Sequence, residues 1–197
     1  MGPRRQDRTR SVLRGAAGAA LIATAAAPLA AGPIATIRTG ADVAMPEGYV
    51  VLDIRDADAC FDRSPPGARC MPTQELLYGD AGAPVGFHAL RWALGTLALT
   101  GDETLVIYPG DTVAQDDALA AAALLYLTGQ TQVLLHDGPA LETDEGGLYR
   151  ALWRDVIYTA PIRTEAMRVA DAPAGRLRDR LKDFATGGDI VAFAAGD

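Results

Sequence analysis

Short apolar runs alternate along the chain with longer segments whose apolar positions recur at helical spacing. Three runs rich in β-branched and leucine side chains predict strands buried on both faces, at 49–54, 105–108 and 133–136. Apolar positions at helical spacing predict helices at 57–62, 87–100 and 117–127, and glycine and proline predict a surface connection at 71–86. This order of elements implies an α/β fold, a mainly parallel sheet flanked by helices on both faces.

The C-terminal part of the chain has a different pattern. Helices are predicted at 148–157, 163–170 and 173–184, and an apolar piece follows at 190–193. The last of these helices carries several basic side chains, which form either an interaction face or an ordinary solvated face: Arg176, Arg178, Arg180 and Lys182. We expect residues 156–197 to be a helical C-terminal extension that packs on the domain or on a partner.

The first 31 residues have the composition of a targeting segment. Five arginines precede an uncharged, alanine-rich apolar stretch at 15–32, as in a secretory signal peptide. The stretch is near the lower limit for spanning a bilayer, so a retained N-terminal anchor is the alternative. In either case the folded part faces the non-cytoplasmic side. We therefore expect a periplasmic protein whose membrane contact, if any, is through residues 1–31.

The charge of the chain is divided unequally. The net charge is −7, and removing the +4 of the first thirty residues leaves about −11 on the rest. An acidic body of this kind argues against nucleic acid as a partner and against adhesion to anionic lipid except through the N-terminus. The chain has one lysine and two histidines, too few for chemistry that needs several amines or imidazoles. We expect no cofactor.

Three aspartates follow the strand predicted at 105–108: Asp111, Asp116 and Asp117. A strand that leads through a tight loop to a helix N-terminus is where α/β proteins commonly bind ligands. The three carboxylates could hold a cation, but aspartates near a helix N-terminus more often act as caps or favour the helix dipole. We therefore predict no metal site.

The two cysteines, Cys60 and Cys70, bracket a loop that contains Pro65 and Pro66. In an exported chain, two cysteines ten positions apart across a turn are expected to form a disulfide. Closing a loop of this size stabilises the fold by roughly 2–3 kcal/mol. A reactive pair, or a single thiol that carries sulfur, is the functional alternative.

Four segments resemble the rhodanese-like family in their order and spacing. They are 50–55 (V-V-L-D-I-R), 66–72 (P-G-A-R-C-M-P), 105–108 (L-V-I-Y) and 137–139 (D-G-P). The resemblance covers roughly residues 36–155. It implies a rhodanese-like domain in which the loop after Tyr108 corresponds to the active-site loop.

The same loop departs from the family pattern. In an active member, the residue after the tyrosine of the strand is the cysteine that carries the persulfide, and here it is Pro109. Proline has neither a nucleophile nor an N–H group. The loop is thus a degenerate one without a cation: Pro109, Gly110, Asp111, Thr112, Val113 and Ala114. The Gly-His pair that precedes Pro-Gly-Ala in the family is replaced by Arg63 and Ser64.

The function expected from these residues is binding. We predict an exported, catalytically inactive rhodanese-like domain that serves as an accessory subunit and binds a protein partner in the cell envelope. One alternative is a sulfurtransferase that uses Cys60 or Cys70, and another is a thiol redox sensor that switches on the same pair. The related phosphatases of this fold need the missing cysteine and an arginine, so that chemistry is not expected.

Overall fold

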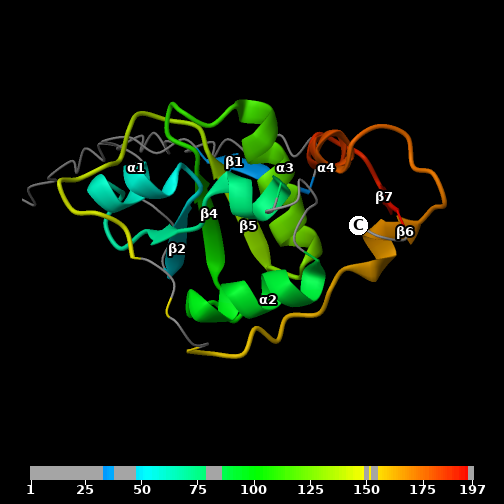
Figure 1. Ribbon diagram of the computed structural model, residues 1–197, viewed down its shortest axis with the longest axis horizontal. Coiled ribbons are helices and arrows are strands. Elements are labelled where there is room, and N and C mark those ends of the chain that lie inside the picture. The colour runs from blue at the N-terminus through cyan, green and yellow to red at the C-terminus, as the bar shows by residue number, and fades with distance from the viewer. Residues whose placement is uncertain (1–32, 38–47, 79–85, 149–150, 152–154, 195–197) are drawn as a thin grey trace, which may run out of the picture.

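A central, twisted parallel sheet organises the computed structural model, which describes residues 33–37, 48–78, 86–148, 151 and 155–194 (Figure 1). The segment predicted to be a signal peptide or anchor lies outside the described residues. Within the part of the chain that the structure describes, no helix is long and apolar enough to cross a bilayer.

The sheet has five strands in the order β1-β5-β4-β2-β3, and all its pairings are parallel. The strands are β1 (Ala35–Ile37), β2 (Tyr49–Asp53), β3 (Arg69–Cys70), β4 (Thr104–Tyr108) and β5 (Gln132–His136). The helices that join them are α1 (Ala57–Asp62), the π-helix η1 (Gln74–Tyr78), α2 (Phe87–Thr96) and α3 (Gln115–Leu127). The predicted fold class, a mainly parallel sheet with flanking helices, is confirmed.

The two faces of the sheet are covered differently. Alternate residues such as Leu52 and Ile107 point into the main core, which contains the apolar faces of α2 and α3. Val51 and Tyr108 point the other way and form a smaller cluster with Leu141. The β2-to-β3 and β4-to-β5 connections run in opposite directions across the sheet, so right-handed crossovers place α1 and α3 on opposite faces.

The register brings three strand ends to one edge of the sheet. Asp53 at the end of β2 is opposite Tyr108 at the end of β4, and Ile107 is opposite Leu135 of β5. The carboxyl ends of β2, β4 and β5 therefore lie side by side, at the place where parallel α/β sheets position ligand sites.

The C-terminal residues pack against the sheet domain. They form the 3₁₀ turn η2 (Thr164–Ala166), β6 (Met167–Val169), α4 (Leu177–Ala185) and β7 (Val191–Phe193). The rings of Tyr126 on α3 and Phe184 on α4 are 6.2 Å apart, and Leu181 is fully buried. Helix α4 thus adds an apolar stripe to the main core, as the spacing of leucines predicted.

Two of the predicted helices are wrong where the structure describes them. Most of 163–170 forms η2 and β6 instead, because β6 pairs in parallel with β7, and such long-range pairing overrides local helical spacing. In the described part of 148–157, Leu148 forms a bridge to Arg69, and residues 155–157 are not helical. Main-chain pairing with β3 takes Leu148 out of a helix, while residues 152–154 lie outside the described ranges.

Other boundaries also differ from the prediction. Helix α4 begins at Leu177 rather than at residue 173. Helix α2 ends at Thr96 rather than Thr100, because the chain reverses at Ala98, whose φ is +54°. The segment predicted as a surface connection contains η1, in which Leu76 and Leu77 are buried in the main core. Residues 79–85 of that segment are outside the described part of the chain.

Candidate functional site

A crevice of about 350 Å³ opens at the carboxyl ends of β4 and β5. Its walls come from the end of β4, the start of the next loop and α3, and the segment after β5: Tyr108, Pro109, Gly110, Asp111, Gln115, His136, Asp137, Gly138, Ala140 and Glu142. The first three residues of the degenerate loop therefore line the crevice. Its last three do not, since Thr112 and Ala114 are exposed and Val113 packs against the core.

The loop after β4 turns tightly over the side chain of Arg55. Gly110 has φ of +54°, and a Cβ atom there would lie 2.6 Å from Cδ of Arg55. A side chain at this position would meet both a strained backbone and a buried neighbour. The guanidinium of Arg55 is also 5.3 Å from the ring centroid of Tyr108, so this arginine lies behind the crevice wall.

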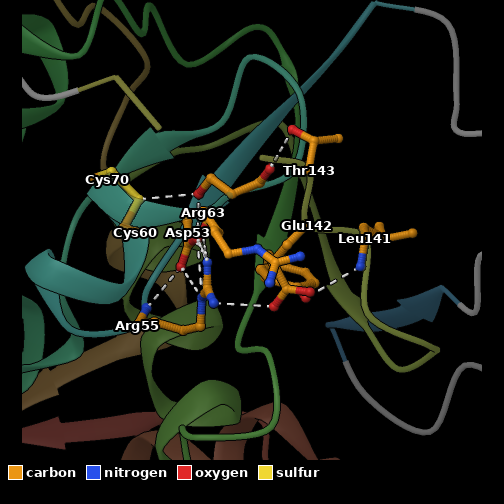
Figure 2. Close-up of polar contacts among 10 residues, drawn as sticks. Asp53, Arg55, Cys60, Arg63, Cys70, Leu141, Glu142 and Thr143 are labelled. Atoms are coloured by element: carbon orange, nitrogen blue, oxygen red, sulfur yellow. Dashed lines mark hydrogen bonds and ion pairs between the residues drawn. A yellow bond between two sulfur atoms is a disulfide. The ribbon is translucent and has the colours of Figure 1, made fainter. Parts of the chain in front are cut away.

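Arg55 is the centre of a buried polar network (Figure 2). Its Nη2 donates to Oδ2 of Asp53 at 2.7 Å and to the carbonyl of Arg63, and its Nη1 donates to Oε1 of Glu142 at 3.0 Å. The hydrogen bond to Asp53 raises the pKa of Arg55. Because both carboxylates bind this guanidinium, its charge is already paired within the protein and is not available to a ligand in the crevice.

Burial changes the acid–base behaviour of the crevice wall. It raises the pKa of Tyr108, and a hydrogen bond with Glu142 adds to the effect. Burial also tends to raise the pKa of Glu142, but the bond to Tyr108 and the charge of Arg55 outweigh it and leave that pKa below its ordinary value. The His136 ring lies 5.3 Å from that of Tyr108, and burial lowers the pKa of His136. At neutral pH the wall therefore holds a carboxylate, a phenol and a neutral imidazole.

The predicted disulfide between Cys60 and Cys70 is confirmed, and both residues are buried. It joins the end of α1 to β3 beside the polar network: Ser64 Oγ is 3.3 Å from Sγ of Cys60 and donates to Asp53 Oδ2 at 2.5 Å. Since the chain has two cysteines, no thiol remains in this oxidised form. A sulfurtransferase that uses Cys60 or Cys70 would first need this bond to be reduced.

A strap, residues 141–148, covers the disulfide. Gly147 donates its N–H to the carbonyl of Cys60 at 2.7 Å, and Leu148 donates to Ala68 at 2.8 Å. A Cβ atom on Gly147 would lie 2.7 Å from Sγ of Cys60 and 2.6 Å from Sγ of Cys70. The strap can therefore lie on the two sulfurs because this residue is glycine.

Asp116 and Asp117 do not share a site with Asp111, contrary to the proximity considered from the sequence. Asp117 accepts a bond from Arg178 Nε at 2.5 Å, and Asp116 lies 3.6 Å from Arg178 Nη1 and 3.8 Å from Lys182 Nζ. These acids at the N-terminus of α3 are partners of basic residues on α4, so they do not set the charge of the crevice. The described residues contain no group of three or more metal-ligating side chains.

Sequence reasoning did not identify His136 or Glu142 as site residues, although both line the crevice. A signal existed for His136, because it ends a predicted strand and the carboxyl ends of neighbouring parallel strands meet at one edge. No local pattern marks Glu142, which lies in an irregular segment and reaches the site through its pairing with Arg55.

No family model matches the chain, and no curated protein does. Among solved structures, it is similar to YnjE, with 18% identity and a TM-score of 0.48 over 61% of this chain and 31% of YnjE. It is also similar to a variant of EanB in complex with ergothioneine, with 20% identity and a TM-score of 0.50 over 65% of this chain and 36% of EanB.

A third similar structure is SseA from Escherichia coli, a 3-mercaptopyruvate sulfotransferase with the "Rhodanese" fold. Its identity is 18% and its TM-score 0.47, over 75% of this chain and 67% of SseA. The chain spans about a third of the length of YnjE and EanB. The parallel strand order and the flanking helices are those of an α/β fold, and the similarity to the EanB variant agrees with this fold.

Proposed function

We propose that this chain is an exported, catalytically inactive rhodanese-like domain that works as a binding subunit for a protein partner in the cell envelope. The observation that carries the proposal is Pro109, which follows the central strand β4 and forms part of the crevice wall. At the position where the resemblance implies a persulfide-carrying cysteine, proline supplies neither a nucleophile nor an N–H donor.

The state of the two sulfurs supports the same proposal. Cys60 and Cys70 are bonded to each other, buried, and covered by Gly147 of the strap. Sulfur transfer requires a thiolate that a sulfur donor can reach. With this disulfide formed, neither cysteine offers one, and this favours a binding role over the sulfurtransferase alternative.

The charge of the crevice is a third support. Asp111, Asp137 and Glu142 line it, and Arg55 behind it is held by Asp53 and Glu142. An anionic sulfur donor such as thiosulfate would meet carboxylates, each costing roughly 1 kcal/mol at 4 Å in water and more in a partly dry crevice. The site is poorly suited to the anions that sulfurtransferases handle.

An assay of sulfur transfer tests the catalytic part of the proposal. The purified protein is incubated with thiosulfate and cyanide, with and without a dithiol reductant, and thiocyanate is measured. We expect none above the level of the Cys60→Ser/Cys70→Ser variant in either condition. Turnover that appears on reduction and disappears on alkylation would establish the sulfurtransferase alternative, and a reduction potential of the Cys60–Cys70 pair near that of the compartment would favour the sensor.

The export and partner parts need their own measurements. N-terminal sequencing of the mature protein from the envelope fraction should start near residue 32 if the segment is a cleaved signal, and at the first residues if it is an anchor. Purification of tagged protein from its own membranes should yield a complex of fixed stoichiometry. A lone, monodisperse protein in the cytoplasmic fraction would contradict both parts.

A further inference from the structure

The small sheet of β6 and β7 has a buried strand and an exposed strand. Val191 and Phe193 of β7 are buried in the main core, whereas Arg168 and Val169 of β6 are exposed, Val169 by 76%. Within the described residues β6 pairs with β7 alone. Figure 1 shows the pair at the periphery of the molecule, at the side away from α1. The outer edge of β6 is therefore a strand edge beside solvent.

The pairing determines which main-chain groups that edge presents. The N–H of Ala170 donates to the carbonyl of Phe193, so Arg168 and Ala170 direct their main-chain groups toward β7. Met167 and Val169 then direct theirs outward. Since the N–H of Met167 already donates to Thr164, the edge offers the carbonyl of Met167 and both polar groups of Val169. This is the hydrogen-bonding pattern that an added strand uses.

An apolar groove of about 540 Å³ lies along this edge. Its lining is mainly apolar, with one charged residue: Phe87, Ile162, Thr164, Met167, Arg168, Val169, Phe193 and Ala194. None of the ion pairs among the described residues includes Arg168. The groove thus combines apolar walls, an open strand edge and a guanidinium that is not ion-paired with any of the described carboxylates.

The charge of Arg168 distinguishes between two possible occupants. If two copies of the chain paired their β6 strands antiparallel about a two-fold axis, Arg168 at the centre of each strand would face Arg168 of the other copy. Like charges directly opposite across a strand pair are destabilising, so the edge is poorly suited to a second copy. It suits a different segment with a carboxylate at that position.

We propose that the outer edge of β6 and its groove bind an extended protein segment that adds a strand to the small sheet. Its alternate apolar side chains enter the groove, and an acidic residue between them pairs with Arg168. This inference rests on the proposed binding function and names the surface and the chemistry of the partner. A free fatty acid or a membrane would satisfy the apolar walls and Arg168 but not the main-chain groups of Val169.

A synthetic peptide tests the inference with the full-length protein. The probe is acetyl-Thr-Val-Thr-Val-Glu-Val-Thr-Val-amide, which places its valines on one face and its glutamate on the other. We expect saturable binding by fluorescence anisotropy, with amide shifts at 167–170 in NMR spectra. N-methylation of the amides along one edge of the peptide should weaken binding about tenfold or more, and along the other edge much less. Equal effects of both patterns, or no binding, would overturn the inference.

A charge swap tests the role of Arg168. Arg168→Glu should weaken binding of the glutamate peptide about fivefold, and a peptide with lysine in place of glutamate should restore it. Arg63→Glu, an exposed arginine near α1, is the matched control and should bind like the unmodified protein. Binding to phosphatidylglycerol vesicles in place of peptide, with the same Arg168 dependence, would assign the groove to membrane and overturn the proposal. Failure of peptide binding leaves the proposed function standing, whereas thiosulfate turnover refutes that function and not this site.

Discussion

Two regions of the molecule differ in how far their polar and apolar groups are exposed. We call them the disulfide end, around Cys60 and Cys70, and the β6 end, around β6 and its groove. At the disulfide end, Asp53, Arg55 and Ser64 are buried and bonded to one another, and the strap covers the sulfurs. At the β6 end, a three-residue strand leaves an apolar groove and a guanidinium open. The disulfide end is therefore closed by contacts within the protein, whereas the β6 end keeps an open groove, the one that we propose binds a partner segment.

The largest expected effect is the loss of the Asp53 charge at the disulfide end. Asp53→Asn keeps the shape but leaves the buried Arg55 with Glu142 as its remaining counter-charge, and breaking a buried pair in this way costs about 3–5 kcal/mol of unfolding free energy. Glu142→Gln is the matched control, since its side chain is 16% exposed, and should cost about 1 kcal/mol or less. Urea denaturation measures both, and equal losses would show that the network is not centred on Asp53.

Removal of the disulfide comes next. Cys60→Ala/Cys70→Ala should lower the unfolding free energy by about 2–3 kcal/mol, because the unfolded chain regains the entropy of an open loop. Wild-type protein denatured in excess reductant should behave like the variant. At the β6 end, Val169→Thr should change stability by at most about 0.5 kcal/mol. If Val169→Thr lowered the unfolding free energy more than removal of the disulfide does, the β6 end would contribute more to stability than the disulfide end.

Gly147→Ala tests whether the strap can pack on the two sulfur atoms only when residue 147 has no side chain. The added methyl group overpacks a closed site, and we expect a loss of about 1–3 kcal/mol of unfolding free energy. In the background without the disulfide the loss should shrink, because the sulfur atoms it meets are gone. Gly86→Ala is the control, since a Cβ atom there has no neighbour within 4 Å. Additive losses would mean that strap and disulfide act independently.

The smallest effect is the pH dependence at the crevice. Burial lowers the pKa of His136 below the ordinary 6.5, so below that pH the unfolded chain binds a proton that the folded chain does not yet bind. The unfolding free energy should therefore be unaffected by His136 above pH 6.5. It should fall as the pH drops from 6.5 toward the lower, folded pKa. In His136→Gln the unfolding free energy, measured from urea denaturation midpoints, should depend less steeply on pH across this range. An unchanged pH dependence would show that the pKa of His136 is not lowered in the folded protein.

The parts of the fold that the sequence predicts are those governed by local patterns. Strands β2, β4 and β5 can be predicted from their apolar runs, because a strand that is covered on both faces is largely apolar. The spacing of Cys60 and Cys70 across a proline-containing turn, in a chain expected to be exported, likewise favours their bond over a reactive pair. The loop after Tyr108 begins where the apolar run ends, because β4 ends at the same residue.

Other parts depend on contacts between residues far apart in sequence. Strand β6 pairs with a strand more than twenty residues later, and no local property of Met167 or Arg168 favours strand over helix. Glu142 is held at the crevice by its ion pair with Arg55, and Asp117 is held away from it by its ion pair with Arg178 on α4. Ion pairs of this kind have no periodic signature, so the charge of the site could not be predicted from the loop alone.

The position of Gly147 over the two sulfurs has a consequence for the order in which the molecule assembles. The cysteines are ten positions apart and precede β4, so oxidation needs only a short early part of the chain. The strap is made much later and has room to lie flat only on a bond already closed, since two separate thiols occupy more space than a disulfide. Once formed, the bond is enclosed by the protein itself, because both cysteines are buried and Gly147 lies over their sulfurs.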